Sequence, residues 1–399
     1  MAAVAEATGV DAGPGPGPSR NGLSGSTWPS RALLVLTVAV AVSPIVIAAA
    51  SIVGDTWYPV GDWAHVVFRV SQVGSRETPL VGAYTVKGWA HPGPLLFWLG
   101  APLHRLTGGD PRSIEWTAAV VNVASLVALA AVAWRRGRWP LLLATMTLAA
   151  LLVRGFTVVR MIDLWNPYVP LLPFALAVFL VWDAALGRRR ALLEAVVPAS
   201  LAMQSHLAFV TLVGLLVVWF VAWDRGHRRV MGVAATVDGG TDGDVGGPPE
   251  TEPWRPYLRR GAWIVALLWC GPLLDLIFDL HNPLRIAATF RHREGRIGIV
   301  RAVDVVGRYV GPDGPWMGGA EERLVPLPDA GPGLLPALLA GVALVACLTV
   351  ARRRRLVDVA ALATLALVLL VGAVPATAQI PLPAEAYLTQ WLKVVGELV

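Results

Sequence analysis

The first residues that could do chemistry lie between positions 54 and 98, directly after an apolar run. Asp62 stands there among Trp57, Tyr58 and Trp63. We predict that a carboxylate held among aromatic side chains at a membrane boundary is poorly hydrated, which raises its basicity toward the range useful for proton abstraction. The alternative is that Asp62 caps the helix that begins there by accepting hydrogen bonds from amides of the first turn.

Other polar residues stand where apolar runs begin or turn. The prolines and glycine of His91-Pro92-Gly93-Pro94 fix a turn that directs His91 back toward the preceding loop, although a histidine before proline is also an ordinary turn residue. Asn166 opens a further run, and Gln204 and His206 interrupt another. Polar side chains at membrane depth are costly unless they are paired or functional, so these residues either contact a substrate or hydrogen-bond neighbouring helices.

The composition predicts the elements that position these residues. Apolar residues make up 55% of the 399 positions and charged residues 15%, with a mean hydropathy of +0.60, which is too apolar for a soluble domain of this length. We therefore expect an all-α fold, a polytopic transmembrane helical bundle. The net charge of +6 comes from short basic clusters between apolar runs, which act as orientation signals, so we exclude nucleic acid as a partner.

Apolar runs that could cross or enter a bilayer follow one another along most of the chain, since about 20 apolar residues span the hydrocarbon core. The run 191–223 is too long for one crossing and has basic clusters on both flanks, which predicts a hairpin that turns near Gln204. The helical spacing of Trp63, Val66, Val67 and Val70 predicts a short amphipathic juxtamembrane helix after Asp62. The runs are 32–53, 92–106, 114–134, 139–153, 167–186, 191–223, 261–280, 332–351 and 357–374.

These runs divide the chain into four predicted parts. Residues 1–31 form a disordered cytoplasmic tail, 32–223 an N-terminal transmembrane catalytic module, 224–260 a flexible cytoplasmic linker, and 261–399 C-terminal transmembrane helices with an external loop at 281–331.

The orientation of the first part is ambiguous. If 92–106 is a full span, Arg135, Arg136 and Arg138 lie outside, and if it enters only partly they lie inside. Charge counting favours partial entry, and both alternatives place residues 54–91 outside.

Five stretches in order resemble a known family. Between about residues 32 and 300 the chain resembles actinobacterial multi-pass proteins of the GT-C glycosyltransferase superfamily, relatives of protein mannosyltransferases and of polyprenyl-phosphate-sugar transferases. The stretches are GDWA, VGAYTVKGWAHPGPLLFWL, WNPYVPLLPF, AMQSHLAFV and LLWCGPLLDLIFDLHNPLRI. The resemblance implies a GT-C-like bundle in the cell membrane that works on its external face, and, in contrast to charge counting, it favours a full span for 92–106.

The resemblance also implies roles for individual residues. Members of the superfamily carry an acidic base in the first external loop and an HP motif at their second helix, so Asp62 and His91 take the catalytic positions. The donor would be a polyprenyl-phosphate-linked sugar, and the acceptor a hydroxyl of a glycan, a glycolipid or a protein. The second acidic residue often adjacent to the first is missing, with Asp55 and His65 the nearest substitutes, so no cofactor is required and a role for a divalent metal stays open.

The departing phosphate needs cationic or hydrogen-bonding partners. Arg291 and Arg293 could clamp it from the second external loop, or they could contact anionic lipid headgroups. The expected substrate-binding residues are Asp55, Arg69, Lys87, Asn166, Gln204, His206, Arg291 and Arg293, with His91 as a further partner of the phosphate. Two other functions are open: a transporter or lipid flippase, and a non-catalytic scaffold in which Asp62 and His91 would not face a common cavity.

Overall fold

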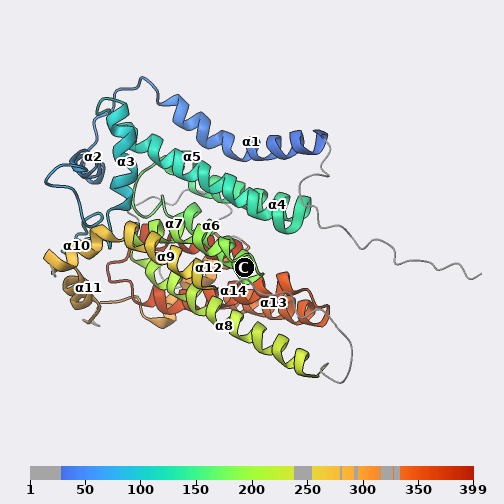
Figure 1. Cartoon of the computed structure of the whole chain (residues 1–399). Helices are drawn as coiled ribbons and strands as arrows, with labels where there is room; N and C mark the ends of the chain where they lie inside the picture. The colour runs from blue at the N-terminus through green and yellow to red at the C-terminus, as the bar shows by residue number, and fades with distance from the viewer. Residues whose placement is uncertain are drawn as a thin grey trace, which may run out of the picture.

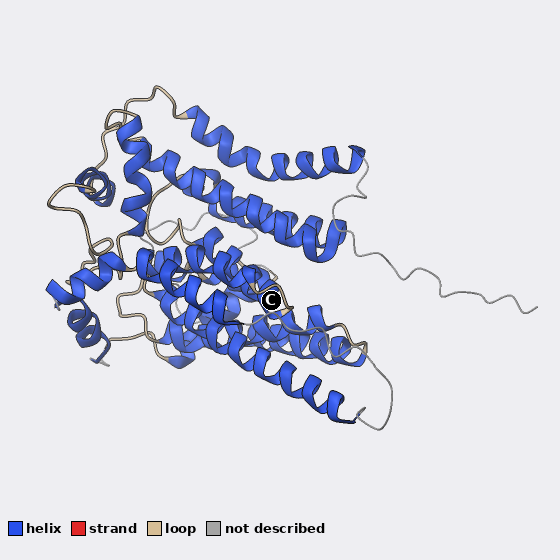
Figure 2. Ribbon diagram, viewed as in Figure 1, coloured by secondary structure: helices blue, strands red, loops and turns tan. Residues whose placement is uncertain are grey.

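The computed structural model describes residues 28–237, 254–278, 281–291, 295–312, 314, 315, 327 and 333–399. These residues form helices joined by loops, and no strand occurs among them (Figure 2). The all-helical class predicted from the composition is therefore confirmed. Residues 1–27, 238–253 and 316–326, which belong to the predicted tail, linker and external loop, lie outside the described residues.

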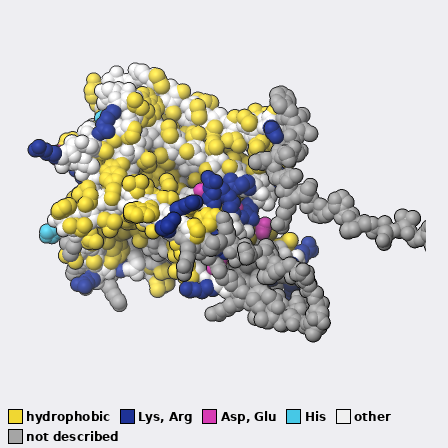
Figure 3. All heavy atoms as spheres, in the orientation of Figure 1, with side chains coloured by type: hydrophobic (Ala, Val, Ile, Leu, Met, Phe, Trp, Pro, Cys, Tyr) yellow, Lys and Arg dark blue, Asp and Glu magenta, His cyan; other side chains and the backbone are white. Residues whose placement is uncertain are grey.

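Within the described part of the chain, five helices are long and apolar enough to cross a membrane. They are α1 (Trp28–Ser51), α4 (Ser113–Phe156), α8 (Ala208–Val237), α13 (Leu334–Arg353) and α14 (Val357–Ala378). A sixth span is possible if α9 (Trp254–Leu268) and α10 (Cys270–Phe278), bent by 59° at their junction, count as one. Hydrophobic side chains cover much of the flank of the molecule, as expected of a surface that contacts lipid (Figure 3).

The 44-residue helix α4 is a hairpin of two antiparallel helices. Arg138 interrupts it with a φ of 51°, and the Asn122 side-chain amide donates to the carbonyl oxygen of Met161 at 2.6 Å. A straight helix would separate residue 122 from the end of α4 by about 50 Å, so the chain must fold back at Arg138. The two halves correspond to the predicted runs 114–134 and 139–153.

Short helices fill the centre of the bundle. The helices α6 (Leu171–Ala185) and α7 (Arg190–Ser205) pack against each other, and only residues 206 and 207 separate α7 from α8. The hairpin predicted for the run 191–223 is therefore confirmed. The one-turn helix α5 (Val158–Met161) links α4 to the loop before α6, and the largest buried side chains of this core include Tyr168, Phe156, Phe174 and Phe209.

One end of the bundle collects arginines around a buried acid, and we call it the arginine end. Asp183, whose side chain is 1% exposed, accepts hydrogen bonds from Arg135 at 3.1 Å, from Arg136, and from Arg188 at 3.2 Å. The Trp182 indole donates to the carbonyl oxygen of Asp358, which brings the start of α14 to the same end. The four consecutive arginines 352–355, directly before α14, therefore lie there too.

The opposite end carries long loops, and we call it the loop end. It holds α2 (Asp62–Gln72), α3 (Leu95–Leu106), α10 and α11 (His281–Arg291), on the left of Figure 1. Helix α3 begins and ends here, because Arg105 near its end donates to the carbonyl oxygen of Val73, and the Trp116 indole in α4 reaches the carbonyl oxygen of Ala49 at 3.0 Å. A full span for 92–106 is therefore wrong, and the partial entry favoured by charge counting holds.

The amphipathic helix predicted after Asp62 is α2. Its residues Val66 and Val70 are buried, and the branched side chain of Val70 lies close to Gly100 of α3. The spacing of apolar residues therefore predicted the helix and its buried face correctly.

The last residues return to the core. The helices α12 (Ile299–Val310) and α15 (Leu392–Leu398) pack beside α14, and Thr389 of η1 (Ala386–Thr389) shares a hydrogen bond with Tyr309 of α12 at 2.8 Å. Lys393 is fully buried, donates to the carbonyl oxygen of Gly155 at 3.1 Å and lies 4.0 Å from the centre of the Phe156 ring. This contact fixes the C-terminal segment against α4.

Candidate functional site

A cavity of about 650 Å³ opens at the loop end. Segments that are distant in the sequence form it: the first long loop, the loop before α6, the turn between α7 and α8, α11, and the chain that follows α14. Five of the predicted site residues line it, namely Asp62, Lys87, His91, Asn166 and His206. The fold therefore brings together half of the residues that the sequence singled out.

Asp62 is held by a tryptophan. The Trp165 indole Nε1 donates to Asp62 Oδ2 at 2.9 Å, while the Trp63 indole donates to Asp163 Oδ1 at 2.8 Å. These two hydrogen bonds join the start of α2 to the loop before α6. Gly61, with a φ of 57°, occupies the cap position of α2, which has no side-chain capping bond, so the capping alternative for Asp62 is wrong. Asp62 is also an exposed residue, and the poor hydration that we expected is not seen.

The backbone around His91 is fixed on two sides. The His91 amide donates to the carbonyl oxygen of Ala83 at 2.8 Å, and the His91 carbonyl accepts from Gly82 at 2.9 Å. Asn282 of α11 forms two hydrogen bonds with the backbone of Ala90, the residue before His91. Its side-chain oxygen accepts from the Ala90 amide at 2.8 Å, and its side-chain amide donates to the Ala90 carbonyl at 3.1 Å. His91 is therefore placed by its own turn and by the second half of the chain.

His91 and His206 form a buried stacked pair. Their ring centroids lie 5.0 Å apart at 28°, and the two residues are 5% and 7% exposed. Burial lowers the pKa of His91 well below its ordinary value, with a smaller contribution from His206, and burial lowers the pKa of His206 to about 4. Both rings are therefore neutral at pH 7, so His91 could serve a phosphate as a hydrogen-bond donor, one of the two kinds of partner that we expected, and not as a cation.

The neutral histidines can still donate hydrogen bonds. Nδ1 of His91 accepts from the Leu207 amide at 3.3 Å, and Nδ1 of His206 accepts from the Ala208 amide at 3.4 Å. In a neutral imidazole the other nitrogen then carries the proton. Each ring therefore has an Nε2–H group available as a donor.

Gln204 serves the fold. It is fully buried, its Oε1 accepts from the Leu95 amide at 3.3 Å, and its Nε2 donates to the Leu268 carbonyl at 2.9 Å. These bonds join α7 to α3 and α9, as the helix-bridging alternative for Gln204 predicted, and the side chain does not line the cavity. Gly93 packs directly on this side chain, since a Cβ there would lie 2.1 Å from Gln204 Oε1.

Other predicted binding residues lie apart from the cavity lining. Asp55 is exposed, and Arg69 donates to the side chain of Gln72 at 2.8 Å within α2. Arg291 is exposed at the end of α11, next to Phe290, which does line the cavity. Arg293 lies outside the described residues. Asp55 and Arg69 do not line this cavity, so their role in substrate binding stays a prediction without support from the cavity.

The segment after α14 supplies residues that the sequence reasoning missed. Glu385 and Tyr387 line the cavity, and the Tyr387 ring lies 5.0 Å from the Trp165 ring. Burial raises the pKa of the Tyr387 phenol, and the nearby charges of Glu385 and Asp62 raise it further. Two carboxylates therefore flank one phenol. The sequence held one signal for this, because Glu385 follows the last apolar run closely, as Asp62 follows the first.

The cavity has a polar side and an apolar side. Asp62, Lys87 and Glu385 provide charged groups, whereas Ile286 and Phe290 of α11 contribute apolar surface, as do two prolines after α14. Among the described residues, no group of three or more His, Cys, Asp or Glu side chains could hold a metal ion. The arrangement can accept a proton, donate hydrogen bonds from two imidazoles and place one ammonium group beside an anion.

Comparisons with protein-family models, with curated proteins and with solved structures found no match. The chemistry of the site itself is therefore the basis for inferring a function.

Proposed function

We propose that the protein is an inverting membrane glycosyltransferase that moves a sugar from a polyprenyl-phosphate donor to an acceptor hydroxyl. One observation carries the proposal: Asp62, Lys87, His91, Asn166, His206 and Glu385, from distant parts of the chain, line a single cavity at the end opposite the arginine clusters. Arginine-rich ends of membrane helices face the cytoplasm as a rule. The cavity then opens on the external face of a multi-pass protein of the cell membrane.

The two sides of the cavity match the two parts of such a donor. The apolar side, with Ile286 and Phe290, suits the first isoprenoid units, and the polar side suits a phosphate and a sugar. Lys87 is a cation among the lining residues. Lys87 therefore takes the role of charge partner to the phosphate, because His91 is neutral and cannot fill that role.

In the proposed reaction Asp62 removes the proton from the acceptor hydroxyl while the acceptor oxygen forms a bond to the anomeric carbon. The bond between that carbon and the phosphate oxygen breaks, and the phosphate leaves with the electron pair. Lys87 and the Nε2–H groups of His91 and His206 stabilise the negative charge on the phosphate. The hydrogen bond from Trp165 orients the carboxylate of Asp62.

The position of Asp62 and His91 also bears on one alternative. A non-catalytic scaffold predicts that these residues do not face a common cavity, whereas both line the same one. That prediction of the scaffold hypothesis is wrong. The experiment below distinguishes sugar transfer from the transporter or flippase alternative.

The test is incubation of the purified protein in liposomes with a panel of labelled polyprenyl-phosphate sugars, with cleavage of each donor as the readout. Asp62→Asn should lower the cleavage rate by about a hundredfold or more, which is the ordinary contribution of a general base. Glu77→Gln is the matched control, because Glu77 is an exposed acid of the same loop whose side chain accepts a hydrogen bond from Gln72 and lies outside the cavity lining. Glu385→Gln shows whether the second carboxylate also takes part.

Full activity in Asp62→Asn would refute the role of the base. Movement of intact labelled donor across the bilayer, with no cleavage of any donor in the panel, would instead favour the flippase alternative.

A further inference from the structure

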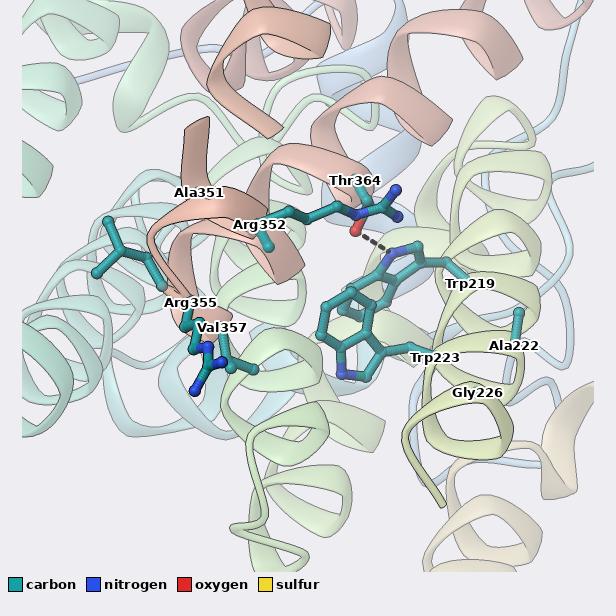
Figure 4. Close-up of a pocket in the computed structure, with 11 residues that line it drawn as sticks. Trp219, Ala222, Trp223, Gly226, Ala351, Arg352, Arg355, Val357 and Thr364 are labelled. Carbon is teal, nitrogen blue, oxygen red and sulfur yellow. Dashed lines mark hydrogen bonds between the residues drawn. The ribbon is translucent and has the colours of Figure 1, made fainter. Parts of the chain in front are cut away.

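A second cavity, of about 680 Å³, lies at the arginine end. It is formed by α8 on one side and by the turn between α13 and α14 on the other, and it shares no lining residue with the cavity at the loop end. Figure 4 shows two tryptophans on one wall and two arginines that extend from the opposite wall. The proposed sugar transfer makes no use of this cavity.

The wall formed by α8 is aromatic and carries an unused donor. The rings of Trp219 and Trp223 stack with centroids 5.7 Å apart at 24°. The Trp219 indole donates to the hydroxyl of Thr364 at 3.1 Å, whereas the buried Trp223 Nε1 has no hydrogen-bond partner among the described residues. A buried N–H group without a partner is uncommon, and a ligand with an acceptor oxygen would satisfy it.

The opposite wall supplies positive charge. Arg352 and Arg355 line the cavity and are exposed, and neither forms an ion pair with an acidic side chain that the structure describes. Arg352 lies in the last turn of the apolar helix α13 and Arg355 follows its end, and Leu356 and Val357, which also line the cavity, are exposed. Arginine and tryptophan at the ends of membrane helices mark the level of the lipid headgroups.

We propose that this cavity binds one anionic phospholipid from the leaflet at the arginine end. The phosphate lies at the wall that carries Arg352 and Arg355, the Trp223 indole donates to an ester oxygen, and an acyl chain packs against Trp219 and Ala360. Charge complementarity requires an anion, and the aromatic wall requires an apolar chain attached to it. Inorganic phosphate would leave the aromatic wall unused, so the ligand is a lipid.

The experiment is native mass spectrometry of the full chain in detergent, titrated with dioleoyl-phosphatidylglycerol or with dioleoyl-phosphatidylcholine. The double variant Arg352→Gln with Arg355→Gln loses the two charges that line the cavity. Its control, Arg353→Gln with Arg354→Gln, loses two charges of the same cluster that do not line it. A charge-assisted hydrogen bond is worth about tenfold in affinity, so the cavity variant should bind phosphatidylglycerol at least about tenfold more weakly than the control.

A second variant tests the site without changing its charge. Ala222→Trp places a large ring in the cavity from an exposed position of α8, so folding should be preserved while lipid binding is lost. This variant decides the question if the arginine variants do not fold.

The proposal is overturned if the cavity and control variants bind phosphatidylglycerol equally, or if phosphatidylcholine binds as tightly. It is also overturned if Ala222→Trp retains wild-type binding, or if inorganic phosphate displaces the lipid at concentrations similar to those of the lipid itself.

Discussion

Replacement of Trp165 by phenylalanine removes one hydrogen bond from Asp62 and leaves an aromatic ring in place. The indole donates to the carboxylate at 2.9 Å, and the ring packs against Tyr168 and Tyr387 at centroid distances of 5.1 and 5.0 Å. A hydrogen bond to a charged group contributes about 1.5–3 kcal/mol, which corresponds to a tenfold to hundredfold change in rate if it orients the base. Asp62 is exposed and water replaces part of the bond, so we expect a loss of about tenfold.

The assay is the initial rate of donor cleavage in liposomes over a range of donor concentrations. Because the bond acts on the base, kcat should fall while the KM for the donor stays constant. Trp116→Phe is the control, since it removes one indole hydrogen bond at the loop end, to the Ala49 carbonyl, away from the cavity. An unchanged kcat in Trp165→Phe, or an equal loss in Trp116→Phe, would refute the role given to Trp165.

Two further predictions concern stability in detergent. Gly93→Ala should lower the thermal midpoint, because its Cβ would overlap the Gln204 side chain and overpacking costs about 1–3 kcal/mol. The control is Gly214→Ala, which has open space around the new Cβ and should leave the midpoint unchanged. Equal midpoints in the two variants would contradict this packing. Buried His206 has a pKa of about 4, against an ordinary value of 6.5, so the unfolded chain binds a proton that the folded protein does not. Stability should therefore decrease as the pH falls from about 6.5 to about 4, less steeply in His206→Gln, and an unchanged slope in that variant would contradict the assignment.

Local signals were enough for much of the fold. The hairpin in the run 191–223 and the helix after Asp62 were both predicted, because hydrophobic length and periodicity act over neighbouring residues. The sequence did not decide whether Gln204 binds a substrate or bridges helices, since the answer depends on whether hydrogen-bond partners from α3 and α9 reach its side chain. The placement of Arg135 and Arg136 likewise depended on Asp183, which is distant in the sequence.

The sequence by itself determined the all-helical class and the apolar runs long enough to cross a membrane, and it singled out Asp62, His91 and His206 as polar residues in an apolar setting. Only the tertiary structure decided that these residues share a cavity and that Glu385 joins them. The physical reason is that a hydrophobic run shows its preference for lipid over about 20 residues, whereas this cavity depends on contacts between segments as far apart in the sequence as Asp62 and Glu385. Burial, which makes the two histidines neutral, arises in the same way from those contacts.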